Sequence, residues 1–296
     1  MKTVDGVITI DKPQGWTSHD VVGKLRRIAQ TKKVGHLGTL DPMATGVLPM
    51  IVGRATRLAQ FFTRNEKVYE GTIRFGFSTD SYDADGSPIS DPQPVDFSET
   101  QLEDWLNRFR GSFDQTPPPI SAKKIGGKKA YELARANIVV ELKPVPVTVF
   151  DLALLSFDGT EARVRIHCTA GTYVRSIAHD VGQLAGCGAH LSALRRTSSG
   201  DFTIESAKTL EQLAALATEG RLSEALVPAA KLLPDFPSEM VDDITEGRIR
   251  QGRDFHVSPF RVRPGSKYVK AISHAGQLVA IGEAKLPNIY HPILVL

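Results

Sequence analysis

Residues 35–46 read GHLGTLDPMATG and hold the chain's densest combination of turn-forming and reactive side chains. Three glycines allow tight turns and a close approach of the backbone to a ligand, so we expect one glycine-punctuated loop. Pro42 restricts Asp41 to an extended conformation, which would present the Asp41 carboxylate at the end of a stiff loop. A carboxylate held in this way can serve as a nucleophile or as a base. The alternative is an ordinary Asp-Pro turn in which Asp41 only accepts a hydrogen bond from a backbone amide.

Strands and helices are mixed on both sides of this loop. Residues 68–75 alternate, with Tyr69, Gly71, Ile73 and Phe75 on the face expected to be buried, which is typical of a half-buried strand. Capping signals and the spacing of apolar residues predict helices that begin near Thr17, Ser98, Val174 and Thr209, and a further helix over 128–136. Because these elements show no regular βαβ pattern, the sequence favours an α+β fold over a doubly wound sheet.

The texture of the sequence changes after about Pro234. Short strand-like pieces follow, separated by glycine and proline, at residues 255–262, 268–273, 278–284 and 293–296. We therefore predict two domains, a larger one over residues 1–237 and a small β-rich one over residues 238–296.

The composition fits a soluble globular protein, with 296 residues of which 41% are hydrophobic and 23% charged. Lys and Arg total 36 against 33 Asp and Glu, so the formal net charge of +3 does not by itself indicate a nucleic-acid partner. The basic residues nevertheless gather in short runs, which would bind phosphates if they shared one face. Solvated helix faces are the alternative. The runs lie at residues 24–27, 32–33, 123–124, 128–129 and 195–196.

Several kinds of site and location are not indicated. The two cysteines, Cys168 and Cys187, form no metal-ligand spacing and no disulfide framework, which fits a reducing cytoplasm. The sequence contains no dinucleotide-binding or P-loop signature. It begins without the apolar core of a signal peptide and has no run of about 18 apolar residues, so we expect a cytoplasmic protein without a membrane span.

Six motifs occur between about residues 5 and 200. They are the loop at 35–46 with its continuation Val47-Leu48, Asp11-Lys12-Pro13-Gln14-Gly15, Lys67-Val68-Tyr69, residues 79–86 (TDSYDADG), residues 117–135, and residues 168–176 (CTAGTYVRS). In content and in order they resemble the motifs of the TruB pseudouridine synthases. The loop at 35–46 resembles that family's catalytic motif, G-H-x-G-T-L-D-P-x-A-T-G-V-L.

The resemblance implies a catalytic core with a mixed or antiparallel sheet and flanking helices, followed by a small PUA-like RNA-binding domain. It implies isomerisation of uridine to pseudouridine in the T-loop of tRNA, at the position conventionally numbered 55. The uracil is detached, rotated and reattached with no redox step and no external group, so we expect no cofactor and no metal. A monomer that binds the T-arm of tRNA is expected. For residues 247–253 and 276–282, which carry the PUA-like resemblance, a packing module without RNA contacts is the alternative.

Three catalytic residues follow from the resemblance. Asp41 would be the nucleophile. Arg175 would hold Asp41 in a bidentate pair and lower the pKa of its carboxyl group, offsetting desolvation. Tyr69 would stack on the extruded uracil, and its hydroxyl could remove the C5 proton. The alternatives are a surface arginine on a helix for Arg175 and a core tyrosine for Tyr69.

Further residues are expected to contact the RNA or to support the site. His36 would contact the RNA and take the space of the extruded base, a loop histidine being the alternative. Lys12 would support the catalytic loop or bind phosphate, and Asp83 would bond a base or a basic partner. The full expected set is His36, Lys12, Asp83, Tyr173, Leu194 and Arg195.

The sequence departs from the family's pattern in a few places. Leu37 is larger than the small residue expected beside His36, Ile120 stands where an aromatic is common, and Thr169-Ala170 differ mildly from the usual pair. These departures concern local packing and remove no reacting group.

Other functions are left open by the residues. One is a non-catalytic RNA-binding protein or tRNA-folding chaperone, against which the combination of Asp41, Tyr69 and Arg175 argues. Another is a related synthase that acts on ribosomal RNA, alone or inside a guide-RNA complex. The compact C-terminal domain without a lysine-rich tail favours tRNA. A hydrolase built on Asp41 and His36 would need a second acid or a metal set, which the sequence does not offer.

Overall fold

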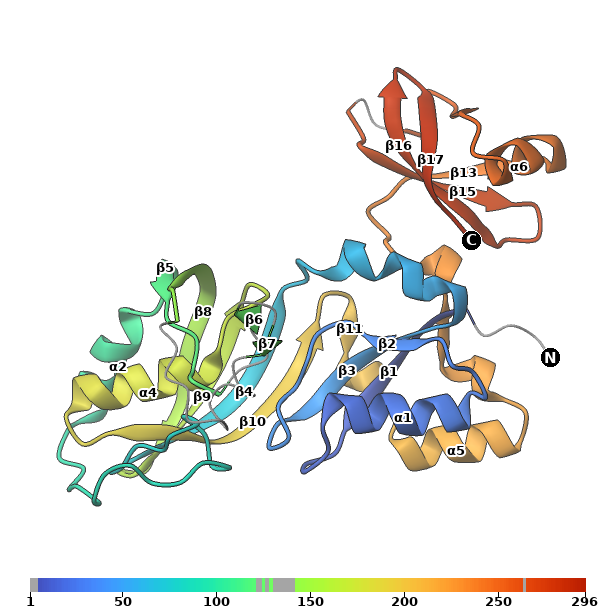
Figure 1. Cartoon of the computed structure of the whole chain (residues 1–296). Coiled ribbons are helices and arrows are strands. Elements are labelled where there is room, and N and C mark those ends of the chain that lie inside the picture. The colour runs from blue at the N-terminus through green and yellow to red at the C-terminus, as the bar shows by residue number, and fades with distance from the viewer. Residues whose placement is uncertain (1–4, 121–123, 126–127, 130–141, 263–264) are drawn as a thin grey trace.

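The larger of the two main β-sheets is built from strands that lie between Gly6 and Pro228 (Figure 1). The computed structural model describes residues 5–120, 124–125, 128–129, 142–262 and 265–296. The large sheet has the strand order β12-β1-β3-β10-β4-β9-β8-β5, with β2 and β11 attached to β3 and β10. Its strands are β1 (Gly6–Lys12), β2 (Val34–His36), β3 (Thr45–Val52), β4 (Lys67–Phe75), β5 (Gly111–Gln115), β8 (Val145–Phe157), β9 (Glu161–Cys168), β10 (Ala189–Ser199), β11 (Phe202–Thr203) and β12 (Leu226–Pro228).

The large sheet is mixed, because β10 runs parallel to β3 whereas its other pairs are antiparallel. Helices α1 (Ser18–Ile28) and α5 (Leu210–Thr218) lie together beside β1 and β3, and α2 (Glu99–Asn107) and α4 (Val174–Ala185) lie together near β8 and β9 (Figure 1). The short 3₁₀ helices are η1 (Gly53–Phe62), η2 (Ile204–Ser206), η3 (Leu222–Ala225) and η4 (Ala229–Lys231).

The smaller sheet belongs to the C-terminal part of the chain and has the order β13-β15-β16-β17-β14. Helix α6 (Asp243–Arg250) packs on it, around a core that contains Ile249 and Val269. The expected α+β class, with a mixed sheet and a small β-rich C-terminal part, is confirmed. The strands are β13 (Ser238–Val241), β14 (Phe255–His256), β15 (Tyr268–Ser273), β16 (Leu278–Leu286) and β17 (Ile289–Val295), and a separate two-stranded sheet joins β6 (Lys124–Ile125) to β7 (Lys128–Lys129).

The predicted helix starts are confirmed where capping chemistry marked them. Thr17, Ser98 and Thr209 each accept a hydrogen bond from the backbone of the third helical residue, whose side chain bonds back to the cap. Strand β4 is also confirmed, with the alternate residues from Tyr69 to Phe75 buried. Capping boxes and apolar alternation depend only on neighbouring residues, so these elements can be predicted from the sequence.

Other expectations were wrong or fall outside the description. The loop at 35–46 is shorter than predicted, because His36 pairs with Met50 in β2–β3 and because Thr45 and Gly46 already belong to β3. Helix α6, capped by Asp242, was not predicted within the β-rich C-terminal region. Of the expected strand at 255–262, only Phe255–His256 forms one. Of the helix expected over 128–136, Lys128–Lys129 form strand β7 and residues 130–136 lie outside the described residues.

Two cores share the large sheet. Alternate residues of β1 and β3, such as Ile8 and Leu48, face α1 in one core. The residues between them, such as Val7 and Ile51, face η1 in a second core that also includes Leu278 and other residues of the C-terminal sheet. Both faces of β1 and β3 are therefore covered, and η1 lies between the two sheets. Within the described part of the chain, no helix is long and apolar enough to cross a membrane.

Replacing Leu58 by alanine should destabilise the protein by about 2–5 kcal/mol, because this fully buried η1 side chain joins the second core. Urea denaturation measures the free energy of unfolding. Leu286→Ala, at an exposed leucine of β16, is the control and should change it by no more than about 0.5 kcal/mol. Equal effects of the two substitutions would show that the second core does not hold η1.

Candidate active site

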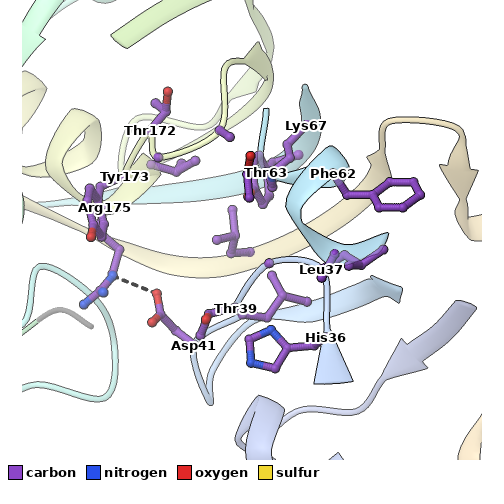
Figure 2. A pocket seen from close by; sticks show the side chains of 18 of the residues that line it. His36, Leu37, Thr39, Asp41, Phe62, Thr63, Lys67, Thr172, Tyr173 and Arg175 are labelled. Carbon is purple, nitrogen blue, oxygen red and sulfur yellow. Dashed lines mark ion pairs between the residues drawn. The ribbon is translucent and has the colours of Figure 1, made fainter. Parts of the chain in front are cut away.

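A pocket of about 620 Å³ lies where the catalytic loop at 37–44, η1, the start of β4 and the start of α4 meet (Figure 2). The loop before α4 contributes Thr172 and Tyr173, and η1 and the turn that follows it contribute Phe62 and Thr63 on the opposite side. The structure thus brings together residues far apart in the sequence. Of the nine expected site residues, six line this pocket: Asp41, Tyr69, Arg175, His36, Tyr173 and Leu194.

Arg175 lies in the first turn of α4, where its guanidinium is shared between two carboxylates. Its Nε is 3.0 Å from Asp41 Oδ2, the contact marked in Figure 2, and its Nη1 is 3.1 Å from Asp83 Oδ2. Nη1 also donates to the Ser81 carbonyl (2.9 Å) and Nη2 to the Ile120 carbonyl (3.2 Å). The expected bidentate pair with Asp41 is therefore wrong in detail. Arg175 is no surface arginine, since only 5% of its side chain is exposed.

The Asp41 carboxyl group faces the pocket, with 37% of the side chain exposed. Burial raises its pKa above the ordinary value, and the Arg175 guanidinium opposes that rise. The expected opposition between desolvation and Arg175 is thus present, but desolvation outweighs the ion pair, and the nearby Asp83 carboxylate raises the pKa further. Among the charged groups near Asp41, Arg175 is the main one that lowers this pKa, and it therefore favours the ionised form that a nucleophilic role would require.

The N-terminal segment fixes the catalytic loop on both sides of Asp41. Before it, Ser18 Oγ donates to the Leu40 carbonyl (3.0 Å) and accepts from the Leu40 amide (2.9 Å). After it, the Pro42 carbonyl accepts from Lys12 Nζ (3.2 Å) and from the Gly15 amide (2.9 Å). Lys12 is fully buried and also donates to the carbonyls of two residues in its own loop. This geometry favours loop support over phosphate binding for Lys12.

Arg196 binds the backbone of the loop through its guanidinium, a role that the sequence analysis missed. Its fully buried guanidinium donates to the carbonyls of Val47 (2.7 Å), Gly38 (3.1 Å) and Thr39 (3.4 Å). The backbone of Arg196 also lies against Gly46, where an added Cβ would come within 2.2 Å of the Arg196 carbonyl oxygen, so only glycine fits. The sequence showed the Arg195-Arg196 pair as a basic run, which gave no sign that one of the two arginines is buried.

Tyr69 and His36 present rings to the pocket. Tyr69 is 7% exposed and pairs with Arg196 across β4 and β10. Burial raises the pKa of its hydroxyl, and Arg196 opposes that rise, so the phenol is neutral near pH 7. His36 has a buried Nδ1 without a hydrogen-bond partner among the described residues, and burial lowers the pKa of its ring.

Three expected residues lie outside the pocket: Lys12, which supports the loop as described above, Asp83 and Arg195. Asp83 is buried behind Arg175, and its Oδ1 accepts from Ser81 Oγ (2.5 Å) and the Asp85 amide (3.2 Å). Arg195 forms a two-point pair with Asp11, at 3.1 and 2.8 Å, beside a smaller pocket of about 250 Å³. The structure therefore places Asp83 as a partner of Arg175 and Arg195 in the lining of the smaller pocket.

Several lining residues had not been predicted. Lys67 lines the pocket, donates to the Asn65 carbonyl (2.8 Å), and has a pKa that burial lowers to about 8. It belongs to the Lys67-Val68-Tyr69 motif, which was the available signal. The departures from the family pattern are accommodated: Leu37 packs in the second core, and Ile120 serves Arg175 through its carbonyl, whatever its side chain. Within the described ranges, no three His, Cys, Asp or Glu residues could hold a metal ion.

An RNA base extruded into this pocket would meet an ion-paired carboxylate and an aromatic ring, the arrangement of a base-modifying enzyme that uses a carboxylate. Residues 26–174 match the family profile described as TruB family pseudouridylate synthase (N-terminal domain), and residues 175–234 match that of the tRNA pseudouridylate synthase B C-terminal domain. The chain belongs to the TruB family of pseudouridylate synthases.

Individual relatives agree with this assignment. The chain is 63% identical over 293 residues to tRNA pseudouridine synthase B of Solibacter usitatus, covering 99% of this chain and all of the relative. It is 47% identical over 234 residues to the same enzyme of Thermobifida fusca, covering 76% and 80%. Among solved structures, it resembles a chain of a Cbf5–Nop10–Gar1 complex, with a TM-score of 0.71 and 28% identity over 96% of this chain and 80% of that one.

The pKa of Lys12 predicts a change of stability with pH. Burial lowers this pKa from the ordinary 10.5 to about 8. Between these two values the unfolded chain binds the Lys12 proton and the folded protein does not, so the free energy of unfolding rises with pH. Lys12→Met removes this contribution. Urea denaturation from pH 7 to pH 10 should show wild type gaining about 1–3 kcal/mol over Lys12→Met between pH 8 and 10.

Lys33→Met is the matched control, because Lys33 is exposed. Its stability should follow the wild-type curve at every pH. A constant difference between wild type and Lys12→Met from pH 7 to 10 would mean that Lys12 keeps an ordinary pKa in the folded protein.

Proposed function

We propose that this chain isomerises the uridine at position 55 in the T-loop of tRNA to pseudouridine, with Asp41 as the nucleophile. Pseudouridine synthesis is the activity of the family, and the relatives' names specify tRNA. The observation that carries the assignment of Asp41 is its ion pair with a buried arginine at the opening of a pocket large enough for an extruded nucleotide.

Each catalytic residue has one task in this proposal. Asp41 attacks the nucleoside and releases the uracil, which rotates and is reattached through carbon. Arg175 keeps the Asp41 carboxylate ionised against the desolvation that the entering base increases. The Tyr69 ring stacks on the flipped uracil and holds it while its bonds are exchanged. The N1–C1′ and C5–H bonds are broken, the C5–C1′ and N1–H bonds are made, and the bond to Asp41 is broken again, so the reaction balances and no cofactor is needed.

The remaining site residues divide into RNA contacts and supports. His36, Tyr173 and Leu194 line the pocket and contact the extruded nucleotide or its neighbours. Lys12 and Asp83 act through Pro42 and Arg175, respectively, because both are buried. Arg195 is 42% exposed and contacts the RNA from outside the pocket, by exchanging part of its pairing with Asp11 for a phosphate.

Residues 1–237 form the catalytic domain, and residues 238–296 form a PUA-like domain that holds the acceptor-stem side of the tRNA. The C-terminal sheet and its own core, beginning at Ser238, support this division. The protein works as a cytoplasmic monomer. Of the alternatives, the relatives' names favour tRNA over a guide-RNA complex, and the intact Asp41–Arg175 pair favours an enzyme over a binding protein.

Asp41→Asn should abolish turnover while tRNA binding changes by less than about threefold, because asparagine keeps the shape and loses the nucleophile. Tritium release from tRNA labelled with [5-³H]uridine measures turnover, and mapping the product locates the modified position. Asp85→Asn, which changes an exposed carboxylate of the neighbouring turn, is the control and should remain active. Appreciable release by Asp41→Asn would remove Asp41 from the role of nucleophile.

Tyr69→Leu should lower the single-turnover rate by about 5- to 150-fold, because the stacking of a base on an aromatic ring contributes about 1–3 kcal/mol. Tyr69→Phe keeps the ring and separates stacking from chemistry at the hydroxyl. A rate near wild type for Tyr69→Phe would assign the effect to stacking. A rate as low as that of Tyr69→Leu would assign it to the hydroxyl. Unchanged kinetics in both variants would return Tyr69 to a structural role.

A further inference from the structure

We propose that Tyr82 and His179 are a positioning pair that fixes Arg175, and through Arg175 the Asp41 carboxylate, for the reaction. The proposal rests on the proposed function of Asp41. It concerns two residues that touch neither the pocket nor Asp41.

The two rings are stacked on each other. Their centroids are 3.7 Å apart and their planes differ by 10°. His179 lies one helical turn after Arg175 in α4, so the two side chains project from the same face of the helix. That face of α4 therefore contacts the turn at residues 79–86 twice, through the Arg175 guanidinium and through the His179 ring.

The stacked tyrosine lies between the two residues of the turn that hold Arg175. Ser81 precedes it and offers its carbonyl to Arg175 Nη1, and Asp83 follows it and pairs with the same nitrogen. A movement of the Tyr82 backbone therefore moves both of these partners. The Nη1 contacts are two of the four polar contacts that the guanidinium makes among the described residues, the others being those to Asp41 and Ile120.

The backbone at Tyr82 is strained. Its φ is +65°, a left-handed conformation that bulky side chains rarely adopt. Hydrogen bonds hold it there: the Tyr82 amide donates to the Thr79 carbonyl (3.2 Å), and the Leu191 amide of β10 donates to the Tyr82 carbonyl (3.0 Å). Such strain persists where the surroundings over-determine it, and the ring stack is the side-chain part of that restraint.

His179 has no competing attachment among the described residues. Its Nδ1 is buried without a hydrogen-bond partner, and burial lowers the pKa of the ring, so a neutral imidazole faces the tyrosine. Stacking is thus the contact that the structure shows for this ring. Removing either ring frees the turn at residues 81–83, and Arg175 is then less well placed to keep Asp41 ionised.

The test compares Tyr82→Ala with Tyr82→Phe, which keeps the stack. Single-turnover rates, tRNA dissociation constants and rate–pH profiles are measured for each. Tyr82→Ala should lower the rate by about 10- to 100-fold with the dissociation constant within about threefold of wild type. Because a displaced Arg175 lets the pKa of Asp41 rise, the acidic limb of the profile should shift to higher pH. Tyr82→Phe should restore both the rate and the limb.

Phe150→Ala is the matched control. Phe150 contacts the ring of His167 on β8 and β9, at 4.9 Å between centroids, so its removal deletes an aromatic–histidine contact that does not involve Arg175. It should leave the rate and the profile unchanged. His179→Leu should reproduce Tyr82→Ala, and the double variant should lose no more than either single one. If Tyr82→Ala does not fold, His179→Leu and Tyr82→Leu carry the same comparison.

A wild-type rate and profile in Tyr82→Ala would overturn the proposal. A lower rate with an unshifted acidic limb would also overturn the proposal, because that result would indicate a general loss of order in the site without a change in the pKa of Asp41. A readout without activity separates this proposal from the proposed function: hydrogen exchange of the Arg175 Nε–H, assigned by its loss in Arg175→Lys, should be faster in Tyr82→Ala than in wild type. Unchanged exchange overturns the positioning pair even if Asp41 proves not to be the nucleophile.

Discussion

The active site depends on one nearly buried guanidinium. Arg175 joins a loop carboxylate, a second buried carboxylate and two backbone carbonyls, and each partner comes from a segment distant from α4 in the sequence. The desolvation of Asp41 raises its pKa, and the attraction of Arg175 is the main influence that opposes this rise and favours the ionised carboxylate. Asp83 has two opposed effects. It helps to anchor Arg175, and its negative charge raises the pKa of Asp41. The ionised form of Asp41 is therefore favoured by Arg175 and opposed by burial and by Asp83, in a pocket that Asp41 shares with an aromatic ring.

The loop that carries Asp41 is fixed just as firmly. Ser18 and Lys12 hold it from the N-terminal segment, and Arg196 holds it from β10, so hydrogen bonds reach the residues on both sides of the nucleophile. Lys12 and Arg196 are cations whose charges are withdrawn from water, which is costly. Their side-chain N–H groups donate hydrogen bonds to backbone carbonyls. Burial of these two charges lowers the stability of the fold. The hydrogen bonds that they make restrict the loop, so that Asp41 lies within reach of Arg175 before RNA binds.

Local signals in the sequence predicted much of this fold. The capping boxes and the alternation in β4 need only neighbouring residues, and the motifs located Asp41, Tyr69 and Arg175 in one site. What the sequence could not reveal depends on non-local packing. Arg195 and Arg196 look alike in a basic run, yet β10 buries the second against the loop and leaves the first with Asp11. The net direction of the pKa shift of Asp41 could not be predicted for the same reason, because desolvation is set by the walls of a pocket that forms only in the fold.

The pocket and the C-terminal sheet are also connected, because residues of η1 contact both of them. Phe61 of η1 lies edge-on to Phe236 and to Tyr268 of β15, with centroids 5.6 and 5.5 Å apart. The next residue, Phe62, lines the pocket. One turn of 3₁₀ helix therefore contributes one side chain to the pocket lining and the preceding side chain to the packing on the C-terminal part of the chain. Because packed interiors yield little to displacement, the position of the C-terminal sheet and the shape of the pocket wall constrain each other. An RNA that binds both parts meets two surfaces whose spacing is already set by this shared core.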